Sequence, residues 1–174
     1  PKLDFMAKDA IGREWQVATI QLDMNMPERF DLTCTNERGE KERIVMIHAA
    51  IMGSIERFLS VLIEHLAGAF PLWCAPLQAV VIPVSEKFEG YANIVLDALL
   101  EDDIRAELSP ADETLGKRVR EAEKMKVPYI LVVGEKEEAA KAVSVRHYQR
   151  GQEGELALDA LRDKLLKEIE ERAL

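Results

Sequence analysis

The chain has 174 residues, of which 48% are hydrophobic and 6% aromatic, and its formal net charge is −9. These values allow one domain or two small ones with an aliphatic core. The negative charge argues against a broad nucleic-acid-binding patch, although it leaves room for a local basic stripe. No apolar run approaches the roughly 18 residues of a membrane span, so no membrane span is expected.

The first part of the chain predicts a hairpin of two strands. Polar and apolar residues alternate, imperfectly, over residues 14–24. The polar segment 35–40 contains a glycine and predicts the turn, and residues 43–49 form the returning strand.

A helix is predicted over residues 54–67, and apolar side chains cover most of its circumference. Such a helix should be buried. Ser54 is placed to supply a capping oxygen at its start, and Gly68 is placed to end it.

The segment 69–76 is punctuated by proline and marks a boundary between domains 1–76 and 77–174. Beyond it, strands and helices alternate, which suggests crossover units and a largely parallel sheet. The predicted strands are 78–84, 104–108, 129–133 and 142–147. The predicted helices are 88–101, 113–126 and 158–173.

The two cysteines, Cys34 and Cys74, lie far apart without CxxC spacing. A disulfide framework or a thiolate zinc site within the chain is therefore not expected. Two free thiols are typical of a reducing compartment, and the plain interpretation is the cytoplasm.

The helix predicted at 54–67 opens with an arginine, Arg57. Arginine is almost never fully buried unless it is paired or bound to something. Because helix N-termini attract phosphate, Arg57 indicates an anionic ligand. The alternative is a structural ion pair with Glu56 or another carboxylate.

Several blocks of the sequence resemble the threonyl-tRNA synthetase family of class II aminoacyl-tRNA synthetases, in the family's order. Motif 3 of that family is similar to IVMIHAAIMGSIERF, and its active-site sheet is similar to GREWQVATIQLDMNMPERFDL. The junction with its anticodon-binding domain is similar to AGAFPLWCAPLQAVVIPVS, and that domain is similar to KRVREAEKMKVPYILVVGEKE and AVSVR. The resemblance covers essentially the whole chain.

The resemblance implies an α/β architecture, α+β overall. The end of a class II antiparallel-sheet catalytic domain would occupy residues 1–76. A three-layer α/β/α anticodon-binding domain with a mixed five-stranded sheet would occupy residues 77–174.

The family activates threonine with ATP and transfers it to tRNA(Thr). Motifs 1 and 2 would lie upstream of Pro1, so Pro1 is interpreted as a cut end and this portion alone is not expected to catalyse. The complete enzyme is expected to be a homodimer. The alternative is a non-catalytic tRNA- or protein-binding module derived from a synthetase.

The resemblance assigns candidate residues for the activation of threonine. Arg57 matches the motif 3 arginine, a catalytic residue that binds the phosphates of ATP, which the complete enzyme uses together with Mg²⁺. Gln16 and Gln21 match glutamines that contact adenosine and the amino acid, and Thr19 lies on the same strand. Ser54 matches a position near the threonine site. The alternative for the strand residues is a solvent-facing polar edge.

His48 matches one of three zinc ligands of the family, where zinc binds the amino and hydroxyl groups of threonine. A catalytic zinc site needs about three protein ligands. The family's other two, a Cys and a His, would lie upstream, so the site is incomplete in this chain. Ala49 stands where the family usually has Arg. A lone histidine at a strand end is more often a satisfied, partly buried residue.

For the anticodon, Glu137 and Arg146 match family positions. Asp112, Thr114 and Lys126 stand where the family commonly has Asn, Lys and Arg, and Asp112 adds a negative charge there.

A basic stripe supports RNA binding in the second half of the chain. Lys117, Arg120 and Lys124 have the i, i+3, i+7 spacing of one helix face. Further basic residues could extend the stripe, namely Lys126, Arg146, His147 and Arg150. Glutamates interleave with these residues, so a solvated charged face is the alternative.

Overall fold

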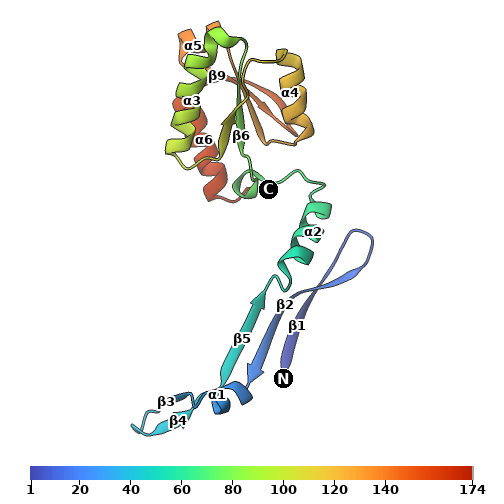
Figure 1. Ribbon diagram of the computed structural model, residues 1–174, viewed down its shortest axis with the longest axis vertical. Coiled ribbons are helices and arrows are strands. Elements are labelled where there is room, and N and C mark those ends of the chain that lie inside the picture. The colour runs from blue at the N-terminus through green and yellow to red at the C-terminus, as the bar shows by residue number, and fades with distance from the viewer. Residues whose placement is uncertain (174) are drawn as a thin grey trace. The chain divides into compact units, whose positions relative to one another are not determined.

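The computed structural model describes residues 1–173, which form two compact units (Figure 1). Unit 1 runs from Pro1 to Ala67 and unit 2 begins at Gly68. Residues 68–76, which the sequence-based division assigned to the first domain, belong to unit 2. The physical reason is burial, because Leu72 and Ala75 are each only 2% exposed.

Unit 1 is built on a three-stranded antiparallel sheet in the order β1-β2-β5. Its elements are β1 (Lys2–Lys8), β2 (Glu14–Asp23), α1 (Asn25–Arg29), β3 (Thr33–Thr35), β4 (Lys41–Arg43), β5 (Met46–Ile51) and α2 (Ile55–His65). The strand predicted at 43–49 is therefore two strands in different sheets, since β4 pairs with β3 and β5 pairs with β2.

An irregularity in β2 decides which side chains share a face. Ala18 lies opposite Phe5 and Gln16 lies opposite Met6, so Val17 is an extra residue in the ladder. Such a bulge reverses the alternation of side chains on one strand. Gln16 and Thr19, three positions apart, consequently point to the same side of the sheet.

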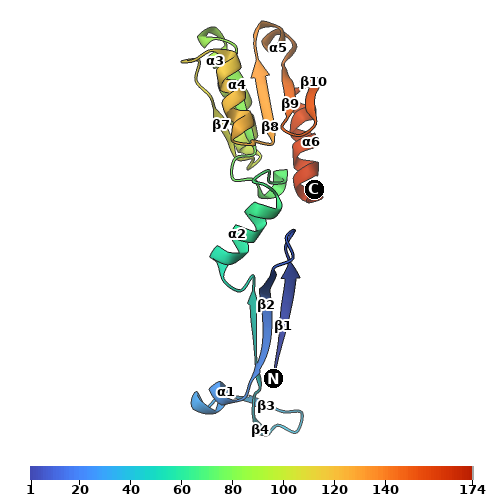
Figure 2. The same ribbon diagram turned by 90° about the vertical axis from the view of Figure 1, so that its right-hand side faces the viewer.

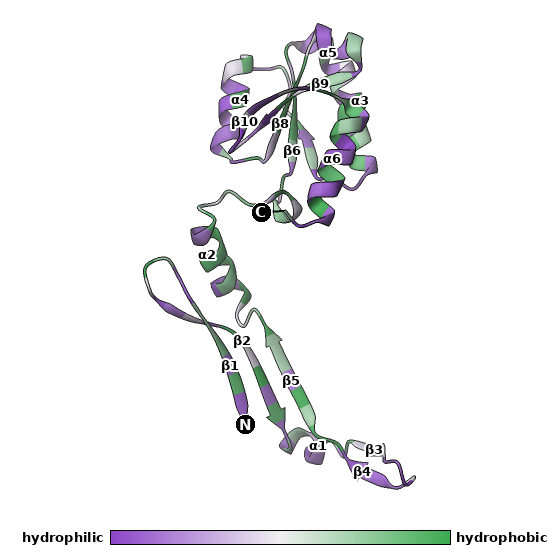
Figure 3. Ribbon diagram, turned by 180° about the vertical axis from the view of Figure 1, so that it is seen from behind, coloured by the Kyte–Doolittle hydropathy of each residue, from purple (hydrophilic) through white to green (hydrophobic). Residues whose placement is uncertain are grey.

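The prediction that helix α2 is buried all round was wrong. None of its residues is buried, and Ile55, Leu59 and Ile63 are exposed by 61%, 44% and 49%. The sheet face opposite Gln16 is also apolar and exposed, and Figure 3 shows hydrophobic residues along α2, β2 and β5. That face carries Leu3, Phe5, Ile20, Leu22, Ile47 and Ile51. The sequence identified the apolar residues correctly, but not their exposure.

Unit 2 is a three-layer α/β/α domain around a mixed sheet of five strands in the order β10-β9-β8-β6-β7. Strand β6 is parallel to β7 and β8, while β9 is antiparallel to β8 and β10. The elements are η1 (Leu72–Cys74), β6 (Ala79–Pro83), η2 (Glu86–Phe88), α3 (Glu89–Glu101), β7 (Ala106–Leu108), α4 (Leu115–Lys124), β8 (Tyr129–Val133), α5 (Glu135–Ala140), β9 (Ala142–His147), β10 (Gly151–Ala157) and α6 (Leu158–Glu170).

Helices α3 and α6 cover one face of this sheet and α4 covers the other (Figures 1 and 2). The larger core cluster joins α3 and α6 to the sheet through residues such as Val95, Leu131 and Leu161. A smaller cluster, including Ile82, Ala122 and Ile130, lies under α4. The aliphatic core expected from the composition is therefore concentrated in unit 2.

Candidate functional site

One face of the sheet in unit 1 carries the polar side chains that the sequence singled out on β2. Gln16 Nε2 donates to Asp4 Oδ1 at 2.9 Å, and Thr19 Oγ1 donates to the same oxygen at 2.8 Å. The hydrogen bond from Lys2, followed by that from Thr19, lowers the pKa of Asp4. Asp4 escaped the sequence analysis because strand β1 was not predicted.

His48 lies on the same face, directly opposite Gln21 on the neighbouring strand. Its Nε2 lies 2.9 Å from Asp23 Oδ2. The backbone N–H of Met26 chiefly lowers the pKa of Asp23, with help from His48. An ionised Asp23 accepts a hydrogen bond from the Nε2–H of His48, and in the neutral ring this leaves Nδ1 as the acceptor nitrogen.

Arg57 lies in the first turn of α2, close to the same part of the sheet. Its Nη2 is 3.7 Å from the point that a Cβ on Gly53 would occupy, and the Gln16 carbonyl oxygen is 3.4 Å from that point. Both distances are ordinary van der Waals contacts, so a Cβ at position 53 would fit beside both groups. Gly53 has a φ of +58°, which favours glycine.

The guanidinium of Arg57 forms no ion pair within residues 1–173, so the ion pair with Glu56 is not present. Glu56 instead accepts a hydrogen bond from Ser54 Oγ at 2.9 Å. Ser54 occupies the N-cap position of α2, but its hydroxyl makes no capping hydrogen bond, which corrects the expected capping role. Arg57 is thus a charged, exposed group available to an anion.

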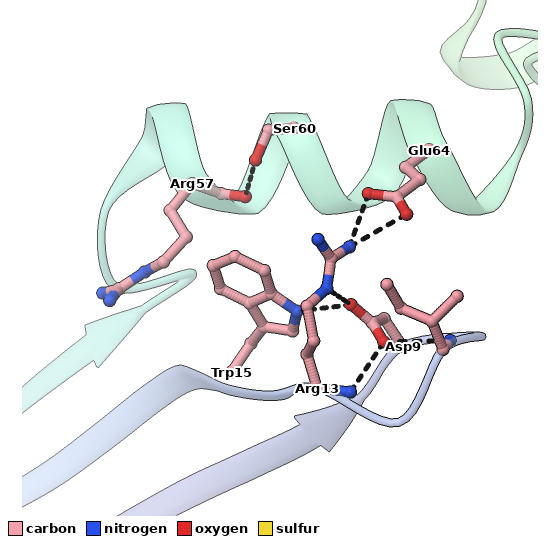
Figure 4. A network of polar contacts seen from close by, with 7 residues as sticks. Asp9, Arg13, Trp15, Arg57, Ser60 and Glu64 are labelled. Carbon is pink, nitrogen blue, oxygen red and sulfur yellow. Dashed lines mark hydrogen bonds and ion pairs between the residues drawn. The ribbon is translucent and has the colours of Figure 1, made fainter.

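A second arginine fastens α2 to the turn between β1 and β2 (Figure 4). Arg13 Nη2 donates to both oxygens of Glu64 at 2.9 and 2.8 Å, and its Nε donates to Asp9. Trp15 Nε1 also donates to Asp9, at 2.9 Å. Desolvation would raise the pKa of Asp9, but these hydrogen bonds outweigh it and lower the pKa to about 2.

The Arg57 side chain extends away from this network (Figure 4). Arg13 therefore links α2 to the turn between β1 and β2, whereas Arg57 takes no part in this network. Sequence reasoning missed Arg13, because its partner Glu64 is far along the chain and no local pattern links the two.

No group of three or more His, Cys, Asp or Glu side chains among the described residues is arranged to hold a metal ion. The candidate ligand His48 has Asp23 as a close neighbour, with 2.9 Å between Nε2 and Oδ2.

In unit 2 the candidate anticodon residues lie near the two opposite ends of the strands of the sheet. Asp112 and Thr114 follow the carboxyl end of β7, and Glu137 follows the carboxyl end of β8. Lys126 precedes β8, and Arg146 pairs with Ile130 near the start of that strand. Helix α4 lies between Thr114 and Lys126, so it connects the two groups.

Intramolecular contacts engage Arg146 and Glu137. Arg146 Nη2 lies 2.6 Å from Glu123 Oε1 on α4. Glu137 Oε2 accepts the Gly134 N–H at 3.0 Å and thereby caps α5. Packing around Gly134 is tight, because an added Cβ would lie 3.1 Å from Val84 Cγ2 and the Val84 side chain would have to shift by a few tenths of an ångström.

The basic stripe on α4 is shorter than the sequence suggested. Lys117 pairs with Glu113 at 2.6 Å, whereas Arg120 and Lys124 are exposed and form no ion pair within the described part of the chain. His147 is buried, and its Nδ1 accepts the backbone N–H groups of residues 149 and 150. Arg150 contacts Glu153, Glu168 and Tyr129. Neither His147 nor Arg150 extends the stripe.

Comparison with known proteins identifies both units. Residues 78–168 match the family described as the anticodon binding domain, and residues 1–66 match the tRNA synthetase class II core domain (G, H, P, S and T). The chain belongs to the threonyl-tRNA synthetase family. It corresponds to the end of the class II core followed by the anticodon-binding domain, as the sequence resemblance predicted.

Curated threonine–tRNA ligases match along the whole chain. That of Thermus thermophilus is 56% identical over 100% of this chain and 26% of its own length. That of Caldanaerobacter subterraneus is 51% identical over 100% of this chain and 27% of its own length. The chain thus spans about a quarter of the length of these relatives.

Solved structures share the fold. The RNA binding domain of threonyl-tRNA synthetase from Cryptosporidium parvum superposes with a TM-score of 0.86 at 38% identity, over 96% of this chain and 42% of that one. A putative threonyl-tRNA synthetase from Aeropyrum pernix gives a TM-score of 0.67 at 30% identity, over 98% of this chain and 42% of that one. None of the helices in residues 1–173 has the length and apolarity that crossing a membrane requires.

Proposed function

We propose that this chain supplies the motif 3 part of the activation site and the tRNA-binding domain of a threonine–tRNA ligase. The observation that carries the proposal is the polar face of unit 1. Gln16, Thr19, Gln21 and His48 share that face, and the unpaired guanidinium of Arg57 lies beside Gly53, near the backbone carbonyl of Gln16.

In this function the threonine carboxylate attacks the α-phosphorus of ATP, pyrophosphate leaves, and threonyl adenylate forms. Negative charge grows on the phosphate oxygens as the bond forms. A fixed guanidinium neutralises such charge, and the positive end of α2 adds to it. Arg57 is therefore the catalytic candidate, while the amides of Gln16 and Gln21 and the hydroxyls of Thr19 and Ser54 orient adenosine and threonine. Mg²⁺, when bound to ATP, supplies further charge neutralisation at the phosphates.

The described residues do not by themselves fit a catalytic zinc ion, because they offer one imidazole where about three protein ligands are needed. His48 is proposed as one ligand of a site completed by groups outside these residues. The contact between Nε2 and Asp23 supports this role, since a carboxylate that holds one ring nitrogen orients the other toward a metal. Zinc would select threonine by binding its amino and hydroxyl groups.

For tRNA(Thr), helix α4 offers the contact surface. Arg120 and Lys124 are free to bind phosphate, and the candidate base-reading residues lie at the two ends of the helix, with Asp112, Thr114 and Glu137 at one end and Lys126 and Arg146 at the other. RNA loops are read by base-edge hydrogen bonds and stacking as well as by charge. The pairing of Arg146 with Glu123 and the acidic Asp112 predict modest affinity.

The same proposal places the complete enzyme in the cytoplasm as a homodimer.

ATP–pyrophosphate exchange with threonine in the full-length protein tests the activation role. The expected result is threonine-dependent exchange that Arg57→Ala reduces about 100-fold or more. Exchange that is unchanged by Arg57→Ala would contradict the role of Arg57. Filter binding of tRNA(Thr) to the chain tests the second role, and no binding at low salt would contradict it.

A further inference from the structure

Helix α4 contains a buried arginine that no motif singled out. Arg118 is 4% exposed, and no carboxylate forms an ion pair with it within residues 1–173. Burying a charge is costly unless the charge is hydrogen-bonded. The hydrogen-bond partners of Arg118 therefore indicate which part of the structure the buried charge stabilises.

Both hydrogen bonds go to one loop. Arg118 Nε donates to the Glu113 carbonyl oxygen at 3.0 Å, and Nη1 donates to the Ser109 carbonyl oxygen at 3.3 Å. These two carbonyls belong to the connection between β7 and α4, residues 109–114, here called the β7–α4 loop. The buried guanidinium of Arg118 thus bridges the two ends of the β7–α4 loop.

A second helix holds the same loop at its middle. Glu89 Oε1, at the start of α3, accepts the backbone N–H of Ala111 at 3.1 Å. The loop is therefore fixed at three points by charged side chains from two helices.

We infer that Arg118 and Glu89 are positioning residues for recognition of an RNA loop by the β7–α4 loop. This inference rests on the proposed tRNA-binding function and deepens it. Asp112 lies between the fixed points and is exposed, and Thr114 follows the last of them. The Thr114 hydroxyl makes no capping hydrogen bond, although Thr114 occupies the N-cap position of α4, so the hydroxyl is available to a ligand.

The physical gain is preorganisation. A loop that is already fixed loses less conformational entropy when RNA binds, and its hydrogen-bonding groups stay in register with the base edges. Arg118 and Glu89 do not touch the RNA in this arrangement. They act through the backbone of the loop.

The experiment compares Arg118→Met, Arg118→Lys and Glu89→Ala in the 174-residue chain. Lys167→Met is the matched control, because it removes one positive charge from α6 on the opposite layer. Hydrogen exchange is measured at the amides of Ala111 and Ile130, the latter in the centre of the sheet. The dissociation constant for a tRNA(Thr) transcript is measured at fixed salt, along with that for a transcript with a changed anticodon.

For Arg118→Met and Glu89→Ala we expect faster exchange at Ala111, unchanged protection at Ile130 and roughly tenfold weaker tRNA(Thr) binding, with reduced discrimination against the changed anticodon. Arg118→Lys should restore part of both effects, and Lys167→Met should change neither. If the Arg118→Met variant loses protection at Ile130, that variant is unfolded. The Glu89→Ala and Arg118→Lys variants then test the inference.

Suppose that exchange at Ala111 becomes faster while the affinity for tRNA(Thr) and the discrimination against the changed anticodon stay the same. This result overturns the inference and leaves the proposed function unaffected. Unchanged exchange at Ala111 in Glu89→Ala and in a folded Arg118 variant also overturns it. A wild-type chain that binds no tRNA overturns the proposed function, and the RNA role of the loop falls with it.

Discussion

Arg146 on β9 and Glu123 on α4 form an ion pair, with 2.6 Å between Arg146 Nη2 and Glu123 Oε1. Both side chains are partly exposed, at 42% and 35%. The pair engages Arg146, for which the sequence resemblance and the proposed function suggest an anticodon contact. RNA binding through Arg146 must therefore compete with Glu123.

Glu123→Gln should strengthen tRNA(Thr) binding to the chain, because it releases Arg146 from its carboxylate partner. An exposed ion pair contributes up to about 1 kcal/mol, so the expected gain is up to about fivefold. Glu121→Gln on the same helix changes the net charge equally without touching Arg146 and is the control. Equal gains in the two variants would show that only net charge matters.

Arg120→Met and Lys124→Met should each make tRNA binding less sensitive to salt. Both side chains are exposed on α4 and can each neutralise one phosphate. Removing one such interaction with a phosphate should reduce the slope of log K against log salt by about 0.7 to 0.9. Arg172→Met, beyond the end of α6, provides the comparison. A slope that stays at the wild-type value in both α4 variants would place the phosphate-binding residues elsewhere.

Arg57→Ala in the full-length enzyme should reduce threonine-dependent ATP–pyrophosphate exchange about 100-fold or more, which is the scale of losing one fixed group that stabilises transition-state charge. Affinity for tRNA should change little. Arg38→Ala, in the exposed turn between β3 and β4, removes the same charge and should leave exchange unaltered. Comparable losses in the two variants would refute a specific role for Arg57.

Asp9 should make the folding of unit 1 depend on acid pH. The pKa of Asp9 is about 2 in the folded state against an ordinary value of 3.8, so the unfolded chain binds more protons between these values. The stabilisation is fully present above about pH 4 and is lost as the pH falls through about 2.

The measurement for Asp9 is urea unfolding followed by Trp15 fluorescence in a Trp73→Phe background, because Trp15 donates its indole N–H to Asp9. Asp9→Asn should be less stable at neutral pH, and the difference from the parent should shrink between pH 4 and 2. A difference that stays constant over this range would rule out the Asp9 carboxylate as its source.

Unit 2 could be predicted from the sequence in most of its elements. Strand 129–133 agrees with β8, because a continuous apolar run between turns is a local signal, and strand 142–147 agrees with β9. Strand β10, Gly151–Ala157, was not predicted, since its polar, glycine-containing sequence acquires strand structure only by pairing with β9.

The residue types of the candidate site followed from the sequence, but their grouping did not. The bulge at Val17 places Gln16 beside Thr19, and the pairing of β2 with β5 places Gln21 opposite His48. Neither relation follows from spacing along the chain, because register is set between strands.

The sequence by itself determined the family, the order of most elements and the apolar surfaces. Only the tertiary structure decided which charged groups are engaged and which are free. Arg146, on a sheet, meets Glu123 on a helix, and Arg118 turns inward to the β7–α4 loop, while Arg57 stays unpaired. The reason is that ion pairs and hydrogen bonds depend on distances across the fold, whereas sequence periodicity reports only the face of an element on which a residue lies.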